Sequence, residues 1–230
     1  MPNLLSNYVG GSKPKLITLL TSGTGTYVPT ADMARCLVRI QAGGAGGSAN
    51  HGGGGGAMTE WMLRIPIAGL AYVVGAGGAA SSNGSLSSFG QYIALPGTWG
   101  NGSGPGMGGP IAFIEGQVDA DGVSGFFPGC AGVAGGAGGS ASSNGFRVGK
   151  PVGTVAAYTG GPVNDNVNQY SGTFWANTAG LKSGGDSFYG TGGAAGSAPA
   201  AGNYGAGGGG HASTPGAGLG GCIEIWDFGA

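Results

Sequence analysis

The chain alternates between short segments with an apolar–polar pattern and long runs of glycine. Residues 36–41 alternate apolar and polar positions, and so do residues 221–228 near the end of the chain. This period of two is typical of a β-strand with one buried face. A turn followed by a short extended piece is predicted at 22–29. Further strands are predicted at 15–20, 60–66, 70–74, 92–95 and 111–114.

Helical patterning is nearly absent. No segment of about twelve residues repeats apolar positions with a period of 3.6 without being interrupted by glycine or proline. We therefore expect almost no α-helix beyond a single turn at 30–35.

Glycine supplies 59 of the 230 residues. Because glycine loses more backbone freedom on folding than any other residue, such a chain is expected to be disordered unless its backbone is satisfied in an unusual way. The composition argues against disorder, since charged residues make up 7% and hydrophobic residues 40%. The main runs are 43–47, 52–56, 75–78, 135–139, 192–196 and 205–210.

These runs are better explained as a packed core than as linkers. Glycine chains can form an extended threefold helix with polyproline II geometry, and they keep the amide that proline lacks. Such helices can pack closely and bond laterally, backbone to backbone, whereas flexible linkers would have Ser- and charge-rich neighbours. We predict lateral hydrogen bonds for 43–47, 52–56 and 207–210. The predicted fold is all-β, with β-sandwich or jelly-roll-like strands packed with polyglycine-II-type extended segments and almost no helix.

Two parts of the chain are distinguished. Residues 1–14 are short, polar and interrupted by glycine and proline, and we interpret them as an N-terminal attachment peptide. Residues 15–230 are predicted to form one glycine-rich β domain. The start resembles no secretory signal. No apolar run reaches the roughly 18 residues of a membrane span, so no membrane insertion is predicted.

The charge and the cysteine content restrict the classes of function that the sequence allows. Eight basic and nine acidic residues are scattered singly and give a net charge of −1, so a nucleic-acid partner is not expected. The three cysteines, Cys36, Cys130 and Cys222, lack the spacing of a metal site and are interpreted as buried thiols. No cofactor is predicted.

The sequence contains no constellation of catalytic residues. His51 and His211 each adjoin a glycine run and are placed at the ends of the packed segments. They could pair on a metal, but capping of backbone carbonyls is the preferred interpretation. Asp119 and Asp121 resemble part of a calcium loop without a third ligand, so a solvated turn is favoured. Carboxylates are too few and isolated for a glycosidase pair, and no enzyme activity is expected.

Candidate binding residues lie in the insertions between glycine runs. Loops on a rigid scaffold commonly carry binding, and aromatic rings with amide groups suit sugars and protein surfaces. The alternative for Tyr158, Phe174 and Trp175 is a core or subunit-interface position, and for the polar cluster at 164–168 a plain turn. The candidates are Tyr92, Trp99, Tyr158, Asn164, Asp165, Asn166, Asn168, Gln169, Tyr170 and Trp175.

The order of these elements resembles the glycine-rich domains at the ends of bacteriophage tail fibres and related adhesins. This resemblance implies a β-sandwich or jelly-roll-like frame on a polyglycine bundle, often in a homotrimer, and recognition of a host cell surface. Family members commonly end long fibres, whereas only about 35 residues precede the array here. The matching stretches are 37–47, 60–69, 72–78, 87–90, 184–193, 204–210 and 220–226.

The leading hypothesis is therefore a non-enzymatic virion receptor-binding protein, a tail fibre or fibre-tip adhesin. It would be made in the host cytoplasm, joined to other virion proteins through residues 1–14, and exposed on the phage particle. Its expected partner is a host cell-surface glycan or an outer-membrane protein. The main alternative is a structural virion protein, such as a capsid decoration or minor tail protein. An ice-binding bundle and a glycan hydrolase are less favoured.

Overall fold

The structure, a computed structural model, is all-β, and its described part contains no helix. Strands form two antiparallel sheets, and a separate pair joins β9 (Arg147–Val148) to β10 (Phe174–Trp175). The described residues are 15–29, 33, 35–64, 69–100, 106–110, 130–133, 135, 138, 147–148, 174–175 and 182–227.

The first sheet has five strands in the order β1-β11-β3-β4-β8. Four of its five strands overlap segments predicted from the sequence, and the period-two pattern predicted two of these, residues 36–41 and the closing strand. The strand β8 was not predicted. A bulge interrupts the pairing of β1 with β11 between Leu16 and Thr18. The strands are β1 (Lys15–Leu20), β3 (Arg35–Gln41), β4 (Met58–Arg64), β8 (Cys130–Val133) and β11 (Cys222–Asp227).

The second sheet has four strands in the order β2-β5-β6-β7. Its short strand β6 was not predicted, and β6 joins β7 through a turn in which Gly90 takes a positive φ of 59°. The strand predicted at 111–114 lies outside the described residues. The helical turn predicted at 30–35 lies mostly outside them too, and Arg35 belongs to β3. The strands are β2 (Gly23–Tyr27), β5 (Leu70–Val74), β6 (Ser87–Phe89) and β7 (Tyr92–Ala94).

Both sheets contribute to one hydrophobic core. Alternate residues of β3, Cys36, Val38 and Ile40, are fully buried, as the alternation predicts. Phe89 of the second sheet is in the same cluster, and its ring packs 5.7 Å from the ring of Tyr27. Each large apolar side chain buried this way contributes roughly 1.5–3 kcal/mol, so this core is a major source of stability.

Two buried polar residues connect the sheets to the glycine runs. Gln41, at the end of β3, donates from Nε2 to the carbonyl oxygens of Gly56 (2.9 Å), Ala42 (3.1 Å) and Ala57 (3.2 Å). Ser87 Oγ donates to the carbonyl of Gln41 (2.7 Å) and accepts from the amide of Gly75 (2.8 Å). These side chains supply hydrogen bonds to backbone groups where strand pairing ends.

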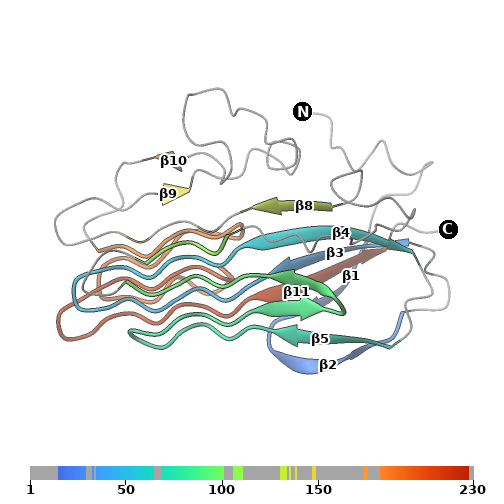
Figure 1. Ribbon diagram of the computed structural model, residues 1–230, viewed down its shortest axis with the longest axis horizontal. Helices are drawn as coiled ribbons and strands as arrows, with labels where there is room; N and C mark the ends of the chain where they lie inside the picture. Colours follow the sequence, from blue (N-terminus) through green and yellow to red (C-terminus); the bar gives the residue numbers. More distant parts are fainter. Residues whose placement is uncertain are drawn as a thin grey trace.

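Beyond the strands, the glycine runs continue side by side as wavy, extended segments (Figure 1). Segment 42–48 leaves β3, and its amides donate to three neighbours: segment 52–57, which enters β4, segment 82–86, which enters β6, and segment 216–221, which enters β11. Its carbonyls accept from the amides of Gly78 and Ser81, of Gly97, and of Gly208 and His211. All of these contacts are hydrogen bonds between backbone groups. The lateral bonding predicted for 43–47, 52–56 and 207–210 is present.

Successive amides of segment 42–48 donate hydrogen bonds to these three neighbours in turn. Ala42 and Ala45 donate to segment 52–57, Gly43 and Gly46 to segment 82–86, and Gly44 and Gly47 to segment 216–221, at 2.8–3.0 Å. Residues three apart thus share a neighbour. The sequence carries the same period, with Ala42, Ala45 and Ser48 at every third position. This local repeat was not predicted from the sequence.

Close approach of the segments explains why they are glycine. A Cβ placed on Gly46 would lie 1.9 Å from the carbonyl oxygen of Ala79, and one on Gly54 would lie 1.9 Å from that of Met107. Real Cβ atoms never come so close to a backbone oxygen, so these positions admit no side chain. Gly220 differs, because the nearest atom to its added Cβ would be 3.4 Å away.

We predict that Gly46→Ala lowers the free energy of unfolding by about 3 kcal/mol, because the methyl group would force two hydrogen-bonded backbones apart. The matched control, Gly220→Ala, has room for its methyl group and should change stability by less than about 1 kcal/mol. Urea denaturation of both variants measures the difference. Equal stability of the two variants would contradict the close packing described above.

Two of the three cysteines, Cys36 and Cys222, are free and fully buried, as the sequence predicts for them. Burial, reinforced by the nearby carboxylate of Asp227, raises the pKa of Cys36 from 9.0 to about 12. Burial also raises the pKa of Cys222 to about 12. The side chain of Cys130 is outside the described part.

These thiols should make the protein less stable in alkali. Their folded pKa values lie above the unfolded one, so their contribution is complete below pH 9 and is lost as pH rises toward 12. Each thiol should lower the free energy of unfolding by about 1.4 kcal/mol per pH unit in that window. Denaturation of wild type and Cys36→Ala between pH 9 and 10.5 tests this. The free energy of unfolding should fall with pH less steeply in the variant, by the contribution of one thiol, about 1.4 kcal/mol per pH unit. Equal slopes for the two proteins would refute the raised pKa of Cys36.

Candidate binding surface at the tip of the glycine segments

Of the ten candidate binding residues, two have side chains that the structure describes. Tyr92 is 9% exposed and its ring packs 4.7 Å from that of Trp61, which places it in the core instead of the surface to which the sequence analysis assigned it. Trp175 belongs to β10, and its side chain is not described. The candidates at 158 and 164–170 lie outside the described residues, as do Asp119 and Asp121.

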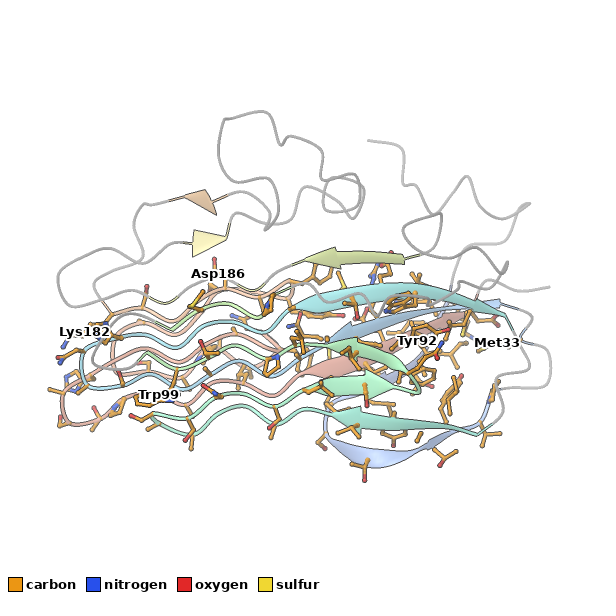
Figure 2. All side chains as sticks on the ribbon, viewed as in Figure 1. Met33, Tyr92, Trp99, Lys182 and Asp186 are labelled. Atoms are coloured by element: carbon orange, nitrogen blue, oxygen red, sulfur yellow. The ribbon has the colours of Figure 1, made fainter. Side chains whose placement is uncertain are left out.

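Trp99 is the second described candidate, and it is half-buried. Its amide donates to Asn83 Oδ1 at 2.9 Å, which joins the segments that follow β7 and precede β6. Figure 2 shows Trp99 and Lys182 toward the end of the glycine segments that is remote from Tyr92 and Met33. Trp99 therefore remains a candidate contact residue.

The turns at this remote end form a surface that we call the tip, comprising residues 48–51, 79–83, 98–99, 182–183 and 211–215. Backbone hydrogen bonds hold the turns together. Ser48 donates to His51 O (2.7 Å) and accepts from the amide of His211 (2.9 Å), and Ser81 donates to Gly47 O (2.8 Å). Segments far apart in the sequence thus meet at one end of the molecule.

The two histidines both lie at the tip, as the sequence predicts. His211 Nδ1 lies 3.3 Å from the amide nitrogen of Ser213 and 3.2 Å from that of Thr214. Since both amides are donors, Nδ1 is the acceptor, and the proton of the neutral ring is on Nε2. His211 thus caps amides, whereas capping of carbonyls was expected. Among the described residues, no group of three His, Cys, Asp or Glu side chains could hold a metal ion.

Backbone strain is concentrated at the tip. Lys182 has a φ of 66° and Ser81 a φ of 58°, and in the described part no other non-glycine residue has a positive φ. This left-handed conformation costs an ordinary L-residue about 1–2 kcal/mol, and such outliers cluster at functional sites. The sequence gives no sign of it, because the conformation is imposed by neighbouring segments.

Lys182 is tied to two of the turns. Its ammonium donates to Ala49 O (3.0 Å), and its carbonyl accepts from the amide of Gly210 (2.7 Å). Nearby, the buried atoms Ser183 Oγ and His51 Nδ1 have no hydrogen-bond partner. The carbonyl of Ser183 faces Gly52, the residue after His51. The tip therefore has hydrogen-bonding capacity that its own described residues leave unused.

A second polar cluster lies on the outer face of the five-stranded sheet. Arg39 forms an ion pair with Glu60 on β4 and approaches Glu224 on β11 at 3.6 Å. Its guanidinium carbon also lies 5.7 Å from the ring centroids of Phe188 and Trp226. Burial opposes the charge of Arg39, but the two glutamates outweigh it and raise the pKa of the guanidinium.

This cluster holds the segment that contains Phe188 and Tyr189 against the sheet. Tyr189 packs edge-on against Phe188 and Tyr204, and burial raises the pKa of its hydroxyl. Ser187 Oγ donates to Tyr204 O at 2.6 Å, which closes the segment on itself. The charges of Arg39 are satisfied and covered by rings, so this face is structural. Its sequence signal is the alternation that places residues 39, 60 and 224 on one face in register.

Comparison with known proteins adds no family. A scan against protein-family models finds no match, and a comparison with curated proteins finds none either. Within the described residues, no helix is long and apolar enough to cross a membrane.

Proposed function

We propose that the protein is a non-enzymatic bacteriophage receptor-binding protein, a tail fibre or fibre-tip adhesin that contacts the host cell with its tip. The observation that supports this most is the tip itself. Turns from separate parts of the chain converge there, and Lys182 and Ser81 are held in a strained conformation. The resemblance of the element order to phage adhesins points in the same direction.

The fold proposal is a β-sandwich joined to a bundle of polyglycine II helices. Shared burial of side chains from the two sheets supports the sandwich. The rotation of amides among three neighbours supports the threefold helix, because a backbone with three residues per turn presents successive amides in three directions.

Such a frame would leave recognition to the turns. Its segments have almost no side chains, so they offer few functional groups for binding. Each segment is held by hydrogen bonds to several neighbours, so the frame is rigid. Binding residues work best on a rigid support. At the tip, Trp99 offers a ring that could stack on the apolar face of a sugar, and His211 offers a donor on Nε2.

The remaining parts of the proposal follow from the sequence. The partner is a host cell-surface glycan or an outer-membrane protein, residues 1–14 attach the protein to other virion proteins, and the assembly is a homotrimer on the phage particle. The candidates at 158 and 164–170 stay predicted receptor contacts.

We predict that purified protein adsorbs to susceptible bacteria and competes with phage for adsorption. Trp99→Ala should weaken adsorption about thirtyfold, because loss of an aromatic anchor at an interface typically costs about 2 kcal/mol. Val73→Thr is the control, since Val73 is 38% exposed on the second sheet and is remote from the tip. Binding of fluorescent protein to cells measures both.

Two outcomes would overturn this proposal. Wild-type protein that binds no susceptible strain, with antibodies against it leaving phage adsorption intact, would exclude receptor binding. Labelling of the phage head in electron micrographs would favour the alternative, a capsid decoration protein.

A further inference from the structure

We infer that the tip recognises an anionic sugar, one that carries a carboxylate or a phosphate, through the ammonium group of Lys182. This inference rests on the proposed receptor-binding function and specifies the chemistry of the receptor. Three features of the tip support it: the backbone conformation of Lys182, the lack of a carboxylate partner for its charge among the described residues, and the exposed donor of His211.

The backbone conformation places a lysine at a position suited to glycine. A φ of 66° is unstrained for glycine, and most positive-φ positions among the described residues are glycine, Gly196, Gly202 and Gly205 among them. A lysine in this conformation is strained, and the contacts of its side chain can offset part of that strain. The bond from Nζ to Ala49 O uses one of the three donors of the ammonium group.

The charge of Lys182 has no carboxylate partner in the part of the chain that the structure describes. Arg39, by contrast, is neutralised by Glu60 and Glu224. The acidic residue closest to Lys182 in the sequence is Asp186, whose carbonyl faces Gly55, one triplet nearer the sheets, and whose Oδ1 accepts from Gly192 N at 2.9 Å. The described tip thus has one cation and no acidic side chain, which favours an anionic ligand.

A second donor of the tip could take part in the recognition of such a ligand. His211 has an exposed ring whose Nε2 is a donor. A carboxylate or phosphate has several acceptor oxygens and so could use this donor together with the remaining donors of Lys182. The atoms Ser183 Oγ and His51 Nδ1 are buried and do not reach the surface of the tip.

The test combines charge variants with matched saccharides. Lys182→Asn and Lys182→Gly remove the charge and suit a positive φ, Lys182→Arg keeps the charge, and Val73→Thr, on the second sheet and remote from the tip, is the control. The ligands are surface polysaccharides of a susceptible strain, used untreated, with their carboxyl groups reduced, or with their phosphates removed. Binding is measured by biolayer interferometry at several salt concentrations, and melting temperature is recorded for every variant.

We expect Lys182→Asn and Lys182→Gly to bind untreated polysaccharide about tenfold more weakly while melting no lower than Lys182→Arg. Lys182→Arg and Val73→Thr should bind as wild type does. One chemical treatment should weaken wild-type binding by the same factor and leave the Asn and Gly variants unaffected. The treatment that does so identifies the anion as a carboxylate or a phosphate.

Failure of this inference can be separated from failure of the proposed function. If wild type binds treated and untreated polysaccharide equally and the Lys182 variants bind normally, the protein is an adhesin for a neutral receptor and the inference is wrong. If Lys182→Asn and Lys182→Gly lose binding only because they unfold, the lysine is a structural tie to Ala49. If wild type binds neither cells nor polysaccharide, the proposed function itself is refuted.

Discussion

The structure depends on one constraint: adjacent backbones must approach closely enough to hydrogen-bond in directions that a β-sheet does not use. A sheet bonds each strand to two neighbours, whereas the amides of segment 42–48 bond to three segments and its carbonyls bond to others. The third direction is available only where no Cβ intervenes. At Gly46, for example, an added Cβ would lie 1.9 Å from the carbonyl oxygen of Ala79. Glycine's entropic cost on folding is thereby offset by hydrogen bonds that no other residue would permit.

The two bonding patterns meet at Gln41 and Ser87. On the sheet side of these residues, side chains alternate between the two faces of each strand and fill an apolar core. On the other side, the segments are mostly glycine and have few side chains. Backbone groups at such a boundary satisfy neither pattern completely, and the side chains of Gln41 and Ser87 bond to four carbonyls and one amide there. The chain can therefore change its mode of packing within a few residues without a loop.

Sequence patterns predicted the frame better than the site. Alternation located the strands that flank the core, including those of Cys36–Ile40 and Ile223–Ile225, because period two reports burial directly. It could also have revealed Arg39 facing Glu60 and Glu224, once the pairing of strands was known. Tyr92 was misplaced because its strand has only three residues, too few to show a pattern. The strain at Lys182 was beyond prediction, since φ there is set by turns distant in the sequence.

The rotation of hydrogen bonds among three neighbours also changes what a turn has to do. In a β-hairpin, the turn fixes the register of the strands that it connects. Here each segment is held in register by partners on several sides, so its alignment survives whatever residues join it to the next. The turns at the tip are therefore not needed to set the register of the segments. The tip turns can therefore differ in length and in sequence while the packed segments stay the same.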